Sequence, residues 1–183
     1  MSTLIDSHLI PTAAPRFHSF SGTSFGGVPM AQQWVDLIVW EGLLNDNPEI
    51  GGIVEIGTFK GGFSLYLAAQ AEARDIFFRT YDVLPPEVRV PGFVQLDVFA
   101  HADAVGAHLS RHEPLVLFCD GGNKARELRT FSEFLSPESL IVVHDWETEF
   151  LRKDVPENVE FVYEPWLNDL DSPSRVFKVK CDV

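Results

Sequence analysis

The sequence predicts an α/β fold: a three-layer α/β/α sandwich around a mostly parallel, seven-stranded sheet that ends in an antiparallel C-terminal strand pair. Three observations predict it. Short apolar strands alternate with helical segments as far as residue 146, as in parallel sheets covered on both faces. The first of these strands passes into a helix through glycines. The last two strand-like runs have no strong helix between them, which indicates an antiparallel pair.

Length and composition predict one domain of ordinary globular character, because 183 residues can bury a full core and 45% of them are hydrophobic. With 27 acidic and 14 basic residues the net charge is −13, which argues against nucleic acid or an anionic membrane as the main partner. Cys119 and Cys181 are too few for a disulfide framework. No apolar run approaches the roughly 20 residues of a membrane span, and no signal pattern opens the chain. We therefore expect a cytoplasmic protein.

Residues 1–29 are expected to form an arm, and residues 30–183 the domain. Glycines and prolines punctuate the arm, while Phe17, Phe20 and Phe25 indicate that it packs against something. It either covers an edge of the core or serves as a lid over the substrate.

The domain begins with apolar residues at helical spacing, from Met30 through Trp34 and Leu37 to Leu44. Asn45–Pro48 ends this helix. The same reasoning predicts helices at 30–44, 62–73, 101–110 and 125–135, and strands at 52–56, 76–81, 93–96, 115–119, 140–143, 159–163 and 175–180.

Each of the first five strands ends in or next to an acidic residue. Because ligands of such sheets bind beyond the carboxyl ends of the strands, these acids predict a binding edge. The five residues are Glu55, Asp82, Asp97, Asp120 and Asp145.

The glycine-bearing turn after the first strand is the most informative stretch. A strand that passes into a helix through glycines leaves free backbone N–H groups and the positive end of a helix dipole together, which suits a charged small molecule. Gly57, Gly61 and Gly62 read G-x-x-x-G-G. This spacing departs from the G-x-G-x-x-G of dinucleotide oxidoreductases, and a P-loop is absent.

The ordered strand ends carry a family resemblance. Glu55-Ile-Gly57-x3-Gly61-Gly62-x-Ser64, a strand-end acid about 27 residues later, then Asp-Gly-Gly-Asn-Lys and His-Asp, resemble a class I S-adenosylmethionine-dependent methyltransferase. The sequence is most similar to the cephalosporin-hydroxylase-like and sugar O-methyltransferase branch, which often carries a segment like Gly27–Pro29. The resemblance covers roughly residues 26–146. It implies a Rossmann-like sheet, and the antiparallel tail fits it.

The resemblance also implies the cofactor contacts. The glycines would approach the methionine part of S-adenosylmethionine, and Glu55 would orient the turn or meet the ammonium group. Asp82 would accept hydrogen bonds from both ribose hydroxyls. Asp97 would accept from the adenine amine, unless it only caps its loop. The implied cofactor-binding set is Glu55, Gly57, Thr58, Gly61, Gly62, Asp82, Asp97, Val98 and Asp120.

Methyl transfer to a hydroxyl requires alignment with the methyl group and a group that takes the proton. His144 is a candidate base because of its reference pKa near 6.5, and Lys124 is another if burial lowers its pKa; Asp120 completes the predicted catalytic set. By the resemblance, Asp120 and Asp145 match the position of a magnesium site, whereas His144 is a poor magnesium ligand. Each of these residues could instead be structural.

The sequence thus predicts O-methylation of a small molecule or sugar. The alternatives are a non-catalytic binding module, favoured by His144 where a carboxylate is usual, and an NAD(P)-dependent oxidoreductase, disfavoured by the glycine spacing. Trp146 would wall the acceptor pocket or pack in the core. Because no large insertion follows the fifth strand, we expect either a small acceptor or a pocket completed by a second subunit, as in a homo-oligomer.

Overall fold

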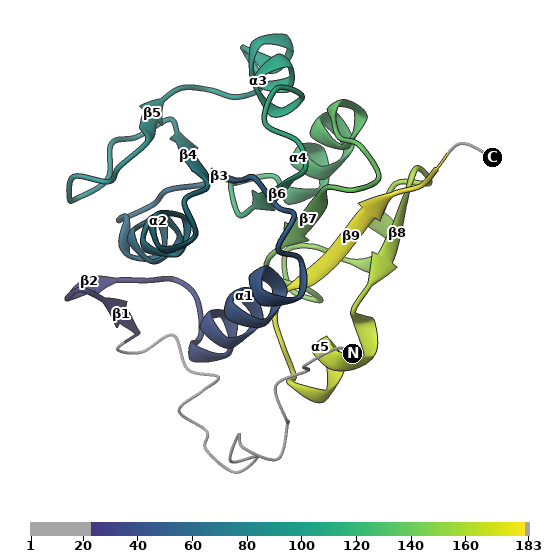
Figure 1. Cartoon of the computed structure of the whole chain (residues 1–183), viewed down its shortest axis with the longest axis horizontal. Coiled ribbons are helices and arrows are strands. Elements are labelled where there is room, and N and C mark those ends of the chain that lie inside the picture. Colours follow the sequence, from purple (N-terminus) through teal and green to yellow (C-terminus); the bar gives the residue numbers. More distant parts are fainter. Residues whose placement is uncertain (1–22, 182–183) are drawn as a thin grey trace.

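The computed structural model describes residues 23–181, which form a seven-stranded sheet between two layers of helices (Figure 1). The strands of this sheet are β3 (Gly52–Ile56), β4 (Phe77–Asp82), β5 (Phe93–Gln95), β6 (Leu115–Cys119), β7 (Leu140–Val143), β8 (Val159–Val162) and β9 (Arg175–Val179). They lie in the order β5-β4-β3-β6-β7-β9-β8. Strands β3 to β7 are mutually parallel, whereas β9 is antiparallel to both of its neighbours. The predicted architecture is confirmed.

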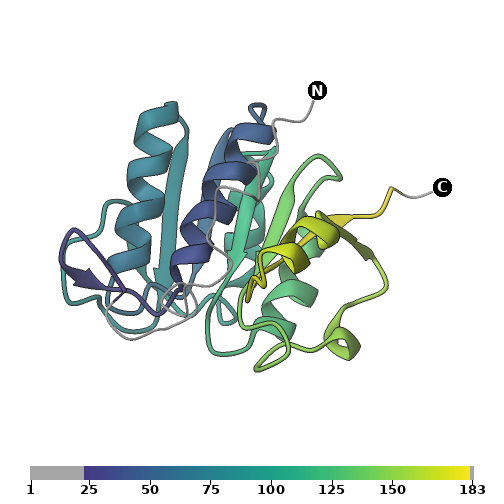
Figure 2. The ribbon, with the colours of Figure 1, turned by 90° about the horizontal axis from the view of Figure 1, so that it is seen from below.

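Helices cover both faces of the sheet (Figures 1 and 2). Residues of α1, α2 and α5 belong to one core cluster, and residues of α3 and α4 to the other. The helices are α1 (Trp34–Asp46), α2 (Gly62–Arg74), α3 (Ala102–Leu109), α4 (Lys124–Phe131) and α5 (Glu164–Asp169), with short 3-10 turns η3 (Ser132–Phe134) and η4 (Arg152–Asp154).

Successive residues of a strand pack into the core clusters on opposite faces of the sheet. Ile53 packs in the cluster under α1 and α2, and Val54 in the cluster under α3 and α4, although both are fully buried. Side chains alternate across a strand, so a strand covered on both faces must be apolar throughout. This explains the continuous apolar runs of β3, β6 and β7.

Two expected helix boundaries and one connection differ from the sequence prediction. Helix α1 begins at Trp34 rather than Met30, and the helix expected at 125–135 ends at Phe131 before η3. The tail connection, expected to lack a strong helix, contains α5. Pro165 lies in its first turn, where the missing N–H costs nothing, and Leu167 is buried in the core.

Residues 1–22 lie outside the described residues. The predictions for Phe17 and Phe20 therefore fall outside them as well. The end of the expected arm forms a two-stranded hairpin, β1 (Ser24–Phe25) and β2 (Val28–Pro29). Its Phe25 ring meets Tyr66 of α2 edge-on, with centroids 5.6 Å apart. This part of the arm therefore packs, as predicted. Among residues 23–181, no helix has the length and apolar character needed to cross a membrane.

Candidate functional site

The turn after β3 is built around close backbone contacts. Gly57 has φ +102°, and a Cβ there would come within 2.4 Å of the Asp120 carbonyl oxygen, so only glycine allows the β3 and β6 ends to meet. A Cβ on Gly62 would meet the Pro29 carbonyl oxygen at 2.3 Å. Gly62 therefore has a structural role in seating the hairpin on α2, and its expected cofactor contact stays a prediction.

Asp82, the acid at the end of β4, holds this turn. Its Oδ2 accepts from the backbone N–H groups of Thr58 and Phe59, both at 2.9 Å, and its Oδ1 accepts from Leu84 at 3.0 Å. A carboxylate can accept further hydrogen bonds beside these. Asp82 thus anchors the glycine turn in addition to its predicted ribose role.

A cavity of about 130 Å³ opens beside Asp82 at the carboxyl ends of β3, β4, β5 and β6. We call it the β3–β5 cavity. It brings together four residues of the predicted cofactor set, and adds Glu127, which the sequence analysis missed. Its lining is Ile56, Gly57, Tyr81, Asp82, Val83, Leu96, Asp97, Val98, Phe99, Gly121, Gly122 and Glu127.

Two carboxylates at this cavity are bound to backbone N–H groups. Asp97 Oδ1 accepts from Phe99 at 2.9 Å and Ala100 at 3.2 Å, so Asp97 does cap its loop. Glu127 accepts from Gly121 and Asn123, both at 3.2 Å, and its burial raises its pKa to about 7. Both residues shape the two loops that border the cavity.

The remaining predicted cofactor residues line a smaller pocket on the other side of Gly57. Glu55, Thr58, Gly61, Gly62 and Asp120 meet there, and residues 29–32 wall it. Glu55 is 1% exposed and accepts a hydrogen bond from Ser64. Burial raises the pKa of Glu55 to about 8, although hydrogen bonds from Ser64 and Thr80 oppose the shift. No cation compensates this carboxyl group within the described residues, so it is protonated at neutral pH.

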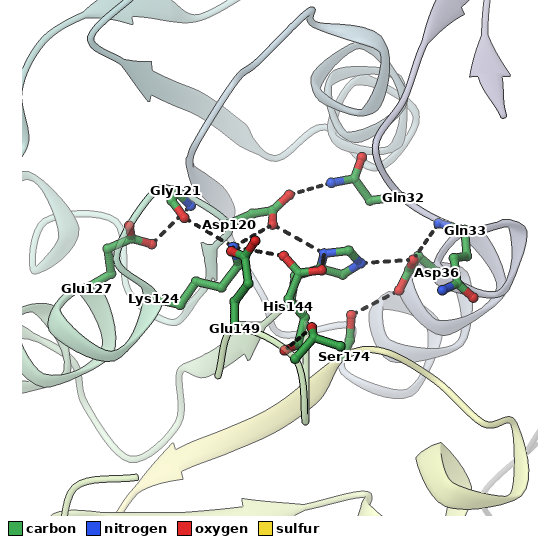
Figure 3. Close-up of polar contacts among 12 residues, drawn as sticks. Gln32, Gln33, Asp36, Asp120, Gly121, Lys124, Glu127, His144, Glu149 and Ser174 are labelled. Carbon is green, nitrogen blue, oxygen red and sulfur yellow. Dashed lines mark hydrogen bonds and ion pairs between the residues drawn. The ribbon is translucent and has the colours of Figure 1, made fainter. Parts of the chain in front are cut away.

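A second assembly lies at the ends of β6 and β7 (Figure 3). We call it the His144 cluster: Asp36, Asp120, Lys124, His144 and Asp145. The His144 ring is 2% exposed; its Nε2 lies 3.3 Å from Asp36 Oδ2, and its Nδ1 lies 3.3 Å from Asp120 Oδ1 and 3.2 Å from Asp145 Oδ1. Three carboxylates from separate elements thus surround one imidazole.

Asp36 holds the cluster from α1. Its Oδ2 accepts from the Gln33 backbone N–H at 2.8 Å, and its Oδ1 accepts from Ser174 Oγ at 2.9 Å. Gln32 in turn donates to Asp120 Oδ2. The segment before α1 therefore reaches the ends of β6 and β7.

Both predicted bases are positively charged. Burial lowers the pKa of His144, but Asp120 and Asp36 outweigh it and raise this pKa well above its usual value. Burial likewise lowers the pKa of Lys124. The charge of Asp120 and the hydrogen bonds to Asp145 and Glu149 outweigh burial, so this pKa is raised above its usual value. The lowered pKa that would make Lys124 a candidate base is not found, because its carboxylate partners outweigh the effect of burial. The catalytic roles of His144 and Lys124 stay predictions.

Two neighbouring residues are buried. Trp146 is 8% exposed and packs against Phe150 and Phe161, so of its two predicted roles it has the one in the core. Cys119 is fully buried in β6, and burial raises the pKa of its thiol, as in an unreactive structural cysteine.

Asp36, Gln32 and Glu149 belong to the site and were missed by the sequence analysis. Asp36 offered a signal, because it is the one charged residue among Met30–Trp40. A single charge within such an uncharged, mostly apolar stretch is either exposed or paired inside the protein. Gln32 and Glu149 offered none, since amides and acids are common in loops.

The order of the strands and the reversal of β9 are those of the Rossmann-like fold of class I S-adenosylmethionine-dependent methyltransferases. No family model and no curated protein matches the sequence. Among solved structures, cmcI with SAH has a TM-score of 0.58 at 15% identity, covering 90% of this chain and 87% of that one. A mutant of MtNAS has a TM-score of 0.53 at 11% identity, covering 81% of this chain.

These likenesses concern the fold. The chain spans 60% of the length of MtNAS. MycE methyltransferase, solved with Mg, SAH and mycinamycin VI, has a TM-score of 0.47 at 14% identity, and the match covers 79% of this chain and 47% of that one.

Proposed function

We propose that the protein binds S-adenosylmethionine in the β3–β5 cavity and transfers its methyl group to an oxygen of a small molecule. One observation carries this proposal: Gly57, Asp82, Asp97 and Val98, chosen from the sequence as cofactor contacts, line one cavity at the switch point between β3 and β6. We assign Asp82 to the ribose and Asp97 to the adenine, since both line this cavity. Gly57 also lines the small pocket at Glu55, and we assign that side of the turn to the methionine part.

The His144 cluster is the proposed acceptor side. Asp120 joins it to the cofactor side, because this residue lines the pocket of Glu55 and lies 3.3 Å from His144. In the transfer, the S–CH₃ bond breaks as the O–CH₃ bond forms, and the electron pair stays on sulfur. The hydroxyl proton passes to a carboxylate or to water, since Lys124 and His144 already carry theirs.

Calorimetry with SAH and NADH tests the cofactor. We expect SAH to bind with one site per chain and NADH to give no comparable heat. Binding of NADH without binding of SAH would instead favour the oxidoreductase alternative.

A non-catalytic binding module remains the second candidate, and the protonated state of both predicted bases favours it. Incubation with S-adenosylmethionine and phenolic or sugar acceptors, read by mass spectrometry, separates the two. A methylated acceptor together with SAH supports the enzyme; SAH binding with no product from any acceptor favours the module.

The other expectations stand as part of the proposal. The net charge of −13 supports a partner other than nucleic acid, and a cytoplasmic location and a homo-oligomer are proposed on the sequence evidence alone. The expectation of magnesium at Asp120 and Asp145 stays untested, and the nitrogen groups around these residues bear on it.

A further inference from the structure

Asp120 and Asp145 have the arrangement of a divalent metal site. One ligand atom from each, with one from His144, lie within 4.8 Å of one another. Paired carboxylates at such distances suit magnesium, which prefers oxygen ligands. The question is whether their oxygens are free to take an ion.

Lys124 already lies among these oxygens (Figure 3). Its Nζ is 2.9 Å from Asp145 Oδ2, 2.9 Å from Glu149 Oε2 and 3.2 Å from the Gly121 carbonyl oxygen. Asp120 Oδ1 is a fourth oxygen, at 3.7 Å. An ammonium group has three protons to donate, and it has an oxygen within 3.2 Å for each. The Lys124 side chain is only 4% exposed, so this position is built into the fold.

Nitrogen groups also face the other oxygens of the acidic pair. His144 Nδ1 lies 3.2 Å from Asp145 Oδ1 and 3.3 Å from Asp120 Oδ1, and Gln32 Nε2 donates to Asp120 Oδ2. Each of the four carboxylate oxygens of the pair therefore faces a nitrogen group. A metal ion would have to displace at least one of these groups and then sit beside a buried ammonium.

The carboxylates of the cluster are paired with cationic groups without a metal. Asp36, Asp120 and Asp145 face Lys124 and His144, and the exposed Glu149 adds a further contact to Lys124. A buried charge is tolerated when it is paired and hydrogen-bonded. A dication at the pair would lie beside the buried ammonium of Lys124, whose remaining carboxylate contact within the described residues would be Glu149.

We propose that the ammonium of Lys124 is the resident cation of the Asp120–Asp145 pair and takes the place of a divalent metal. The acidic pair of this protein then binds no magnesium, and the buried positive charge of Lys124 is fixed beside it instead. The consequence for methyl transfer rests on the proposed function: the reaction is insensitive to chelators. The ion-binding consequence does not depend on it.

The test is a titration of Mn²⁺ into the wild type and Lys124→Met, followed by electron paramagnetic resonance of the free ion. Methionine keeps the unbranched chain as far as Cε and removes the charged ammonium group. We expect no stoichiometric site in the wild type, and one site per chain in Lys124→Met that binds at least tenfold more tightly. Adding Asp145→Asn to Lys124→Met abolishes that site. Lys60→Met, at a lysine paired with Glu87 away from the cluster, leaves Mn²⁺ binding as in the wild type.

Two results would overturn the proposal. One is a stoichiometric Mn²⁺ site in the wild type that Asp145→Asn removes. The other is no site in a folded Lys124→Met, checked by circular dichroism; Lys124→Gln serves in its place if Lys124→Met does not fold. SAH calorimetry on the same preparations reports the proposed function separately, since failure of SAH to bind leaves the Mn²⁺ result unchanged.

Discussion

The two halves of this edge of the sheet bury carboxyl groups in opposite ways. In the small pocket beside Gly57, Glu55 is buried with hydroxyl partners only, and burial raises its pKa to about 8. In the His144 cluster, by contrast, Asp145 has two cations beside it; burial would raise its pKa, but His144 and Lys124 lower it well below its usual value. Burial alone therefore does not decide protonation here. The presence or absence of a paired cation does.

The largest expected effect is on the pH dependence of stability through Glu55. Because its pKa rises from 4.5 to about 8 on folding, the folded state holds a proton that the unfolded state releases. Wild-type stability therefore falls as pH rises from 4.5 to 8, by about 4 kcal/mol. Glu55→Gln has no ionisable group at this position and lacks this loss. The difference in free energy of unfolding between Glu55→Gln and the wild type should therefore shift in favour of the variant by about 4 kcal/mol between pH 4.5 and pH 8. Urea unfolding of the unliganded protein measures it.

Glu160→Gln, at an exposed position of β8, serves as the control and should keep the pH profile of the wild type. Parallel profiles for Glu55→Gln and the wild type would show that Glu55 is ionised in the folded protein. The contrast between the two halves would then be lost.

The second effect concerns Asp36. Asp36→Ala removes the carboxylate that faces His144 Nε2 and accepts from Ser174, and leaves a buried cation with one partner fewer. We expect a loss of about 3 kcal/mol in the free energy of unfolding at pH 7. Chemical denaturation checks it against Glu49→Ala, which is exposed and should change stability by less than about 0.5 kcal/mol. An equally small loss of stability in both variants would contradict the inference that Asp36 of α1 stabilises the His144 cluster.

A smaller effect is expected on cofactor binding. Asp82→Ala removes two backbone contacts of the glycine turn, one contact to Leu84 and the predicted ribose acceptor. We expect the affinity for SAH to fall at least tenfold, which is about 1.4 kcal/mol. Asp103→Ala, an exposed acid on α3, should bind SAH as the wild type does. Unchanged binding by Asp82→Ala would contradict both roles assigned to this residue.

The smallest expected effect is an absence of titration. The pKa of His144 is raised well above 6.5 by Asp120 and Asp36 despite its burial, so the ring keeps both protons from pH 6 to 8. Nitrogen-15 NMR of the ring should show two protonated nitrogens throughout. His101, which is exposed, provides a comparison in the same spectra. Loss of a ring proton from His144 near pH 6.5 would restore it as a candidate base.

The sequence predicted what depends on local pattern. Strand-end acids follow from chain order, so Asp82 and Asp97 could be placed at one cavity once the strands were assigned. Protonation could not be predicted, because it depends on which groups meet across the sheet. Asp36 lies 108 residues from His144 in the chain, and no periodicity reveals such a pair. Helix α5 was missed because a proline usually interrupts a helix. Pro165 lies in the first turn, where a proline is tolerated, and the sequence alone does not show that position.

A crystal structure of the protein with SAH tests the central claim most directly. The account predicts adenosine in the β3–β5 cavity, with its ribose beside Asp82, its adenine beside Asp97 and Val98, and its sulfur directed toward Asp120 and the His144 cluster. SAH bound elsewhere, or an adenosine that leaves Asp82 without a ribose contact, would contradict it.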